Sequence, residues 1–132
     1  MTMIGILFQK AFDARQNAYA PYSQFKVGAA VLTDKGNIYT GANAENVSYP
    51  CGTCAEAGAI AAMVVASERL ISDIVVVADS HNLITPCGAC LQRILEFSNE
   101  ATTIHLADLK GIQKSYKLKE LLPVAFHEDL KR

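Results

Sequence analysis

The chain has 132 residues, of which 51% are hydrophobic and 19% are charged. This composition excludes a disordered or fibrous protein, and the length fits one domain spanning residues 1–132. Its 12 Lys and Arg residues against 13 Asp and Glu residues give a net charge of -1. Because proteins that track nucleic-acid phosphates usually carry a basic excess or stripe, we expect a small ligand rather than a nucleic acid.

The hydrophobic pattern predicts helices and strands along the whole chain. In chain order it predicts a helix over 3–17, strands over 25–33 and 38–43, a helix at about 54–69, a strand over 74–78, a helix at about 88–98, strands over 102–107 and 112–117, and a short helix over 118–122. Pro21 cannot continue the first helix, and Asp34-Lys35-Gly36-Asn37 has the composition of a hairpin turn. The order of these elements predicts an α/β fold in which helices cover both faces of a mixed sheet.

No stretch of the sequence approaches the about 18 apolar residues of a membrane span, so we expect no membrane partner. Residues 1–9 lack the basic region of a secretory signal. We therefore expect a cytoplasmic protein. Cysteines in that compartment stay reduced, so the four in this chain are expected to serve catalysis or metal binding.

The four cysteines form two Cys-x-x-Cys pairs, Cys51/Cys54 and Cys87/Cys90. This arrangement alone is typical of a structural zinc site with four thiolate ligands. Both pairs, however, lie at the predicted start of a helix, where the helix dipole favours thiolate over thiol. Three protein ligands instead of four would leave one zinc position for water, as in a catalytic site.

The residues next to these cysteines favour catalysis. Zinc nucleobase deaminases carry H-x-E followed by P-C-x-x-C, and a three-cysteine variant exists. This chain has Cys54-Ala55-Glu56 and later Pro86-Cys87-Gly88-Ala89-Cys90. We therefore predict that Cys54, Cys87 and Cys90 bind Zn²⁺ and that Glu56 moves protons beside the metal-bound water. The plain alternative for Glu56 is a carboxylate that only stabilises a helix N-terminus.

From Tyr19 to Phe126 the sequence resembles the small, homotetrameric cytidine deaminases. Besides the cysteine motifs, the matching segments are Ala20-Pro21-Tyr22-Ser23-x-Phe25-x-Val27-Gly28-Ala29-Ala30, Gly41-x-Asn43-x-Glu45-Asn46-x-Ser48-Tyr49 and Glu120-Leu121-Leu122-Pro123-x-x-Phe126. The resemblance implies a three-layer α/β/α sandwich with a mixed five-stranded sheet and one Zn²⁺ per subunit. It also implies hydrolytic deamination of cytidine and 2′-deoxycytidine, in which zinc-bound hydroxide attacks C4 and Glu56 is the proton shuttle.

The same resemblance implies substrate-binding residues. Asn43 and Glu45 match residues that hold a ribose hydroxyl, Phe25 matches an aromatic residue near the pyrimidine, and Ala55 belongs to the same predicted site. Tyr49 and Phe126 match residues by which neighbouring subunits complete each site, so a homotetramer with shared active sites is expected. The alternative for these residues is an ordinary place in the core, a strand end or a loop.

The chain departs from the commonest family pattern in three places. Many three-cysteine members have Arg after the Cys-Ala-Glu triplet and after the second Cys-x-x-Cys, where this chain has Ala57 and Leu91. Arg93 is a candidate substitute that could balance the thiolate charge. Cys51 is also unusual, and we interpret it as a spare thiol, an oxidation-sensitive neighbour of Cys54 or a fourth ligand.

Two other functions remain open from the sequence. A deaminase of the same superfamily could act on a different aminopyrimidine, such as a nucleoside antibiotic of the blasticidin type. A non-enzymatic binding module could instead use all four cysteines for a structural zinc ion. A polynucleotide-editing deaminase is disfavoured, because the chain has no Trp and only a weak net charge.

Overall fold

The computed structural model of the chain describes residues 1–127. Its elements are α1 (Met3–Gln16), β1 (Val27–Thr33), β2 (Ile38–Ala42), a 3₁₀ turn (Tyr49–Cys51), α2 (Ala55–Val65), β3 (Ile71–Ala78), α3 (Gly88–Glu96), β4 (Thr103–Asp108), β5 (Gly111–Lys117) and α4 (Leu118–Leu121). Every helix and strand predicted from the sequence is present. None of the helices within residues 1–127 combines the length and apolar character needed to cross a membrane.

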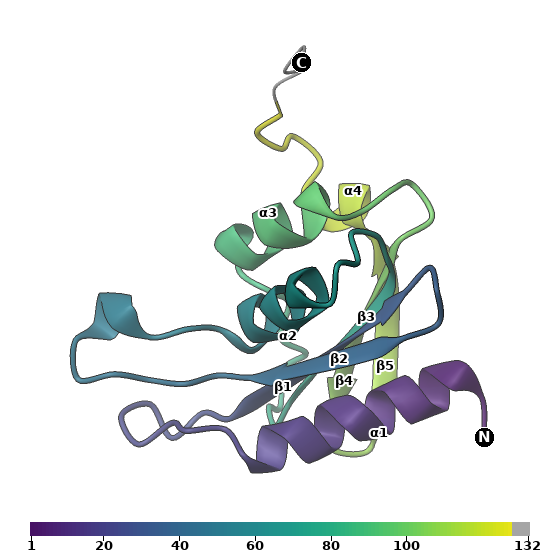
Figure 1. Cartoon of the computed structure of the whole chain (residues 1–132). Coiled ribbons are helices and arrows are strands. Elements are labelled where there is room, and N and C mark those ends of the chain that lie inside the picture. Colours follow the sequence, from purple (N-terminus) through teal and green to yellow (C-terminus); the bar gives the residue numbers. More distant parts are fainter. Residues whose placement is uncertain (128–132) are drawn as a thin grey trace.

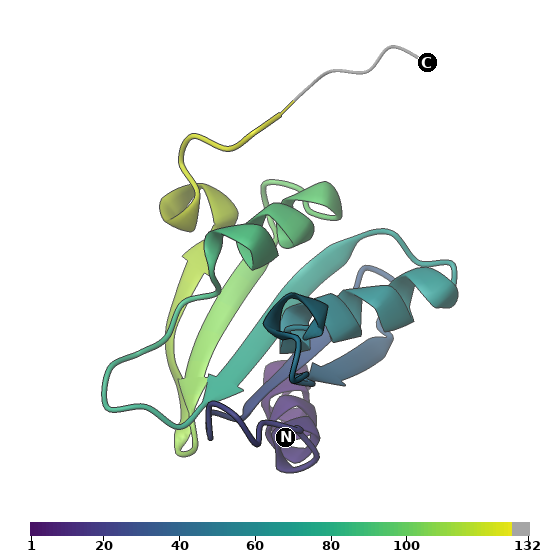
Figure 2. The same cartoon turned by 90° about the vertical axis from the view of Figure 1, so that its left-hand side faces the viewer.

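The five strands form one mixed sheet in the order β2-β1-β3-β4-β5. Only the β3–β4 pair is parallel within this sheet, and the other three neighbouring pairs are antiparallel. Helix α1 lies on one face, whereas α2, α3 and α4 lie on the other (Figure 1). The turned view gives the same layering, with α2 and α3 on the side of the sheet away from α1 (Figure 2). The predicted three-layer α/β/α sandwich is confirmed.

The central strands supply both halves of the core. Successive side chains of a strand point to opposite faces, so a strand covered on both faces must be apolar throughout. In β3, Ile74 and Val76 pack toward α2 and α3, while Val75 and Val77 pack toward α1. All four are buried, which confirms the strand predicted over 74–78, although β3 begins earlier, at Ile71.

Two glycines allow the helices to lie close to the sheet. A Cβ atom at Gly28 in β1 would come within 2.1 Å of the Ala11 carbonyl oxygen in α1. A Cβ atom at Gly41 in β2 would come within 2.3 Å of the Ala55 carbonyl oxygen and 2.4 Å of the Ala59 nitrogen in α2. Gly41 therefore lets the first turn of α2, which carries Glu56, pack directly against the backbone of β2.

Some boundaries differ from the prediction for physical reasons. Helix α2 ends at Val65 rather than near 69, because Ser67 adopts a left-handed conformation with φ 66°. The strand predicted over 25–33 begins only at Val27. The backbone before it forms a turn in which Gln24 has φ 60° and its N–H donates to the Ala20 carbonyl. Phe25 therefore lies just outside the strand, in the segment that leads into β1.

Candidate active site

The two cysteine motifs lie at the starts of α2 and α3. Cys54 is the N-cap residue of α2 and Cys87 is the N-cap residue of α3. Cys90 follows in the first turns of α3, where it is 1% exposed. The predicted helix starts are thus confirmed, and the positive end of each helix dipole lies at an N-cap cysteine.

A pocket of about 390 Å³ lies where these helix starts meet the end of β2. Its wall includes eight of the residues singled out from the sequence, namely Cys54, Cys87, Cys90, Glu56, Asn43, Glu45, Ala55 and Tyr49. Within the described chain, the aromatic rings of Phe25 and Phe126 are not part of this wall. The structure therefore brings together the three cysteines, the acidic residue and most of the expected substrate-binding residues.

Glu56 is a buried carboxylate at the beginning of α2, with 5% of its surface exposed. Burial raises its pKa, because the charged form loses hydration, and the positive charge of Arg93 and a hydrogen bond with Cys90 only partly oppose this. A buried acid with a raised pKa, placed beside potential metal ligands, has the character of a group that exchanges protons.

The donor atoms of the pocket suit zinc. Burial raises the pKa of the Cys90 thiol, and the negative charges of Glu56 and Cys54 raise it further. A bound Zn²⁺ reverses this tendency, because it holds thiolates and releases their protons. Within residues 1–127, no three His, Cys, Asp or Glu side chains already have the mutual spacing to hold an ion.

Asn43 follows β2, and its side chain forms hydrogen bonds with the segment that leads into β1. Its side-chain oxygen accepts a hydrogen bond from the Val27 nitrogen at 2.8 Å, and its amide nitrogen donates to the Phe25 carbonyl oxygen at 2.8 Å. The amide therefore fixes the backbone on both sides of Lys26. This role was not predicted from the sequence, because no motif spacing relates Asn43 to a segment 16 to 18 residues earlier.

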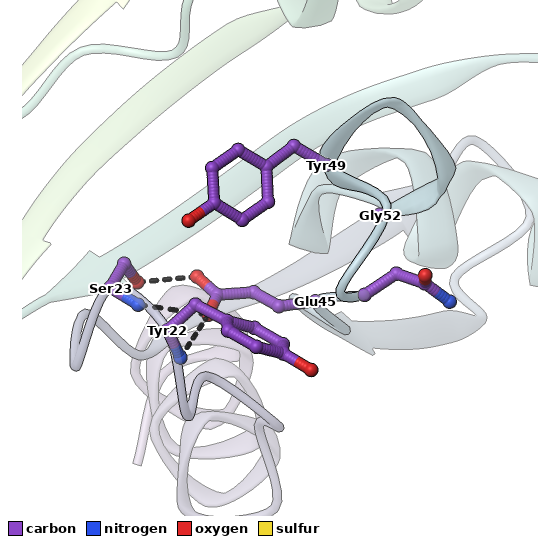
Figure 3. A pocket seen from close by; sticks show the side chains of 6 residues that line it. Tyr22, Ser23, Glu45, Tyr49 and Gly52 are labelled. Carbon is purple, nitrogen blue, oxygen red and sulfur yellow. Dashed lines mark hydrogen bonds between the residues drawn. The ribbon is translucent and has the colours of Figure 1, made fainter.

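Glu45 lies in the next turn of the same loop and contacts the Tyr22–Ser23 backbone. Its Oε1 accepts from the Tyr22 and Ser23 nitrogens at 3.0 Å each, and its Oε2 accepts from the Ser23 hydroxyl (Figure 3). The hydrogen bond from the Ser23 side chain is the largest of the contacts that lower the pKa of Glu45. The carboxylate is thus held ionised at the edge of the pocket.

Tyr49 and Phe126 are aromatic residues at the molecular surface, 76% and 75% exposed. Tyr49 projects from the 3₁₀ turn, where its ring meets the ring of Tyr22 edge-on at 6.1 Å between centroids. The carbonyl oxygen of Phe126 accepts a hydrogen bond from the Gln92 side chain of α3 at 3.0 Å. Only Tyr49 reaches the pocket of the same chain, whereas the Phe126 ring lies outside it.

A comparison with protein families decides to which family this site belongs. The family model described as "Cytidine and deoxycytidylate deaminase zinc-binding region" matches residues 1–106. The chain belongs to this deaminase family. That membership confirms the resemblance found in the sequence, and it supports zinc as the cofactor of the three-cysteine pocket.

Individual relatives agree with the family assignment. The chain is 42% identical over 123 residues to a cytidine deaminase of Sporosarcina psychrophila, covering 93% of this chain and 90% of the relative. It is 41% identical over 121 residues to a cytidine deaminase of Halalkalibacterium halodurans, covering 92% of each. The crystal structure of a cytidine deaminase from Burkholderia pseudomallei superposes with a TM-score of 0.88 at 40% identity, covering 96% of this chain and 100% of that chain.

Leu91 occupies one of the two positions where the resemblance led us to expect an arginine. It is 5% exposed and packs in the core between the sheet and α3. Arg93, two residues later, donates from Nη1 to the Cys90 sulfur at 3.3 Å. That hydrogen bond, together with the negative charges of Cys90, Cys54 and Cys87, raises the pKa of Arg93. The guanidinium group therefore contacts one predicted ligand, Cys90, and is close enough to Cys54 and Cys87 for their charges to act on it.

Cys51 has a different position from the other three cysteines. It ends the 3₁₀ turn, is exposed, and points its sulfur toward the Ser48 hydroxyl at 3.6 Å. It is absent from the pocket wall that the described residues form around Cys54. This position favours the spare-thiol interpretation over the fourth-ligand interpretation, and so disfavours a zinc module that uses all four cysteines.

Proposed function

We propose that this chain is a zinc-dependent deaminase that hydrolyses cytidine and 2′-deoxycytidine to uridine and 2′-deoxyuridine with release of ammonia. The observation that carries this proposal is that the buried Glu56 shares one pocket with Cys54, Cys87 and Cys90 at two helix starts. A structural zinc site needs no buried acid beside its ligands. Membership of the deaminase family and the cytidine deaminases among its relatives support the same function.

Each residue of the pocket has a defined part in the reaction. Cys54, Cys87 and Cys90 hold one Zn²⁺, and the bound ion supplies a water molecule activated for attack near neutral pH. Glu56 accepts a proton from this water and donates one to N3 of the pyrimidine, which makes C4 electrophilic. Once the oxygen of this water is bonded to C4, Glu56 takes the remaining proton of that hydroxyl group and passes it to the amino group. The C4–N bond then breaks and ammonia leaves, so one carboxylate acts as both base and acid.

Asn43 and Glu45 give the pocket its preference for a nucleoside. Both line the pocket that contains Glu56, and the Asn43 amide nitrogen keeps a second hydrogen beyond the one donated to Phe25. A ribose hydroxyl can occupy these free positions, whereas a free base leaves them unpaired. Unpaired polar groups in a binding site discriminate strongly between substrates.

The proposed enzyme is a homotetramer with shared active sites, in which residues 1–132 form one catalytic domain. The resemblance of Tyr49 and Phe126 to residues of shared sites supports this arrangement, and both rings are exposed and so accessible to a neighbouring subunit. Light scattering on the purified protein tests it. A stable and fully active monomer would exclude sites completed by neighbouring subunits. The cytoplasmic location stays a prediction from the lack of a secretory-signal pattern in residues 1–9.

The decisive experiment follows the ultraviolet absorbance of cytidine mixed with the zinc-loaded protein, with Glu56→Gln in parallel. Wild type is expected to remove the cytidine band, and Glu56→Gln to lose more than the about 10²–10⁴-fold typical of a single proton transfer. Zinc content and circular dichroism confirm that the variant is folded and loaded. A variant rate within about tenfold of wild type would remove Glu56 from the mechanism.

A second substrate separates the proposal from its closest alternative. A nucleoside antibiotic of the blasticidin type is offered to the same zinc-loaded wild type under the same conditions. Cytidine is expected to react much faster. Turnover of the antibiotic alone would assign the chain to another aminopyrimidine, and turnover of neither compound would favour a binding module.

A further inference from the structure

The carboxylate of Glu45 is held at both of its oxygen atoms. Two backbone N–H groups, from Tyr22 and Ser23, bind Oε1, while the hydroxyl group of Ser23 binds Oε2 (Figure 3). The two backbone bonds hold Oε1, and among these contacts only the Ser23 hydroxyl holds Oε2. The Ser23 hydroxyl is thus the contact that sets the direction of the second oxygen.

The Ser23 hydroxyl has its own orientation fixed by the backbone. The Phe25 nitrogen donates to Ser23 Oγ at 3.0 Å, so one lone pair of the hydroxyl oxygen accepts this hydrogen bond. A serine hydroxyl has one hydrogen to donate, and here that hydrogen points to Glu45. The same side chain thereby links Glu45 to the segment that carries the Phe25 ring.

Glu45 lies between two cavities of the same chain. One is the pocket of about 390 Å³ that contains the cysteines and Glu56. The other, of about 280 Å³, lies between Tyr22 and Tyr49 and includes Ser23 in its wall. Glu45 therefore lines both cavities, and Oε2 keeps a lone pair beyond the one that accepts from Ser23.

We propose that Ser23 is a positioning residue that orients the Glu45 carboxylate to accept a hydrogen bond from a sugar hydroxyl of the nucleoside. This inference rests on the proposed function, since it assumes a nucleoside in the pocket. Ser23 itself acts only through Glu45. A charged acceptor that is already oriented strengthens substrate binding, because the carboxylate loses less conformational entropy when the sugar binds.

The test compares cytidine with 2′,3′-dideoxycytidine, which lacks both ring hydroxyls, in wild type and Ser23→Ala. The measured quantity is the ratio of kcat/KM for the two substrates. In Ser23→Ala we expect this ratio to fall by about tenfold, mainly through a higher KM for cytidine, as for loss of an oriented hydrogen bond to a charged group. A merely structural role would lower kcat/KM for both substrates equally and leave the ratio unchanged.

Two further variants complete the experiment. Ser23→Thr keeps the hydroxyl and is expected to keep most of the wild-type ratio. Ser115→Ala is the matched control, because Ser115 also bonds a titratable side chain, His105, at 2.7 Å, but it lies in β5 outside both cavities. If Ser23→Ala does not fold, Ser23→Cys replaces it, since a thiol has a similar shape and is a weak donor.

The outcomes distinguish the two proposals. A wild type that deaminates neither substrate would overturn the proposed function and this inference with it. A wild type that deaminates cytidine, with a substrate ratio unchanged in the Ser23 variant, would overturn the role of Ser23 alone. A ratio that falls in Ser23→Ala and is retained in Ser23→Thr and Ser115→Ala supports it.

Discussion

Arg93 and Cys90 lie three residues apart on α3, and the guanidinium Nη1 donates to the cysteine sulfur at 3.3 Å. Residues at this spacing share one face of a helix, so the helix itself holds the pair together. Three thiolates around one Zn²⁺ carry a net charge of about -1, and the helix dipoles at the two N-cap cysteines, about +0.5 each, act against it. The guanidinium group of Arg93 adds a full positive charge beside Cys90.

Replacement of Arg93 by alanine is expected to weaken zinc binding by about 10- to 100-fold, the usual effect of removing a group that hydrogen-bonds a metal ligand. Competition with a chromogenic chelator measures this affinity without reference to activity. Arg69→Ala is a matched control, because Arg69 follows the opposite end of α2 from Cys54 and bonds only backbone carbonyl groups in the contacts described.

A compensating variant sharpens this prediction. Arg93→Ala combined with Ala57→Arg places an arginine at the other position where the resemblance led us to expect one, next to Glu56. We expect the double variant to regain part of the lost zinc affinity. If Arg93→Ala changes neither zinc affinity nor cytidine turnover, Arg93 has no part in the charge balance of the site.

Asn43→Ala is expected to affect both stability and substrate use. From the sequence alone, this change should lower the turnover of cytidine and leave the turnover of free cytosine unaffected. The structure adds the two hydrogen bonds by which Asn43 holds Phe25 and Val27. Their loss is expected to cost about 2 kcal/mol, at about 1 kcal/mol for each hydrogen bond.

Thermal unfolding and the two turnover rates separate these effects of Asn43. The unfolding midpoint should fall by several degrees, and any measurable cytosine turnover should fall as well, because the Phe25 segment is released. The exposed Asn82 provides an Asn→Ala control in a loop that follows β3. An unaltered midpoint together with an unaltered rate on cytosine would restore the simpler interpretation, in which Asn43 contacts only the sugar.

The parts of this molecule that were predictable from the sequence depend on local pattern. The strand over 74–78 is a continuous β-branched run, and Cys54 and Cys87 precede helical periodicity, so both signals lie within a few residues. The Cys-Ala-Glu and Pro-Cys-x-x-Cys motifs similarly indicated the residues that meet in the candidate pocket, because the chemistry of zinc requires these residue types at close spacing.

The remaining features depend on contacts between distant segments. Ser23 meets Glu45 because the loops after α1 and β2 lie side by side, and Tyr19 exchanges backbone hydrogen bonds with both Asn43 and Glu45. Neither hydrophobic period nor motif spacing records such a pairing. The early end of α2 has a similar origin, because the chain turns at Ser67 and brings Glu68 against the β1–β2 hairpin.

Glu68 is a buried carboxylate, 4% exposed, that joins the end of α2 to this hairpin. It accepts hydrogen bonds from the Thr33 hydroxyl at 2.6 Å, from the Asn37 amide at 2.9 Å and from the Tyr39 hydroxyl. The bond from Thr33 is the largest cause that lowers the pKa of Glu68 below its ordinary value of 4.5, followed by the bond from Tyr39. The folded state therefore binds the proton of Glu68 less tightly than the unfolded chain does.

This difference in pKa predicts how stability depends on pH. A carboxylate whose pKa is lowered on folding stabilises the protein fully above its unfolded pKa, and this contribution is lost as the pH falls through the folded pKa. We therefore expect wild type to unfold at a higher temperature than Glu68→Gln at pH 6, with the difference shrinking below about pH 4.5. Glu100→Gln, at an exposed position, is the matched control and should alter neither midpoint appreciably. A Glu68→Gln midpoint that parallels wild type from pH 6 to pH 3 would mean that the carboxylate is not held in its charged form by the hairpin.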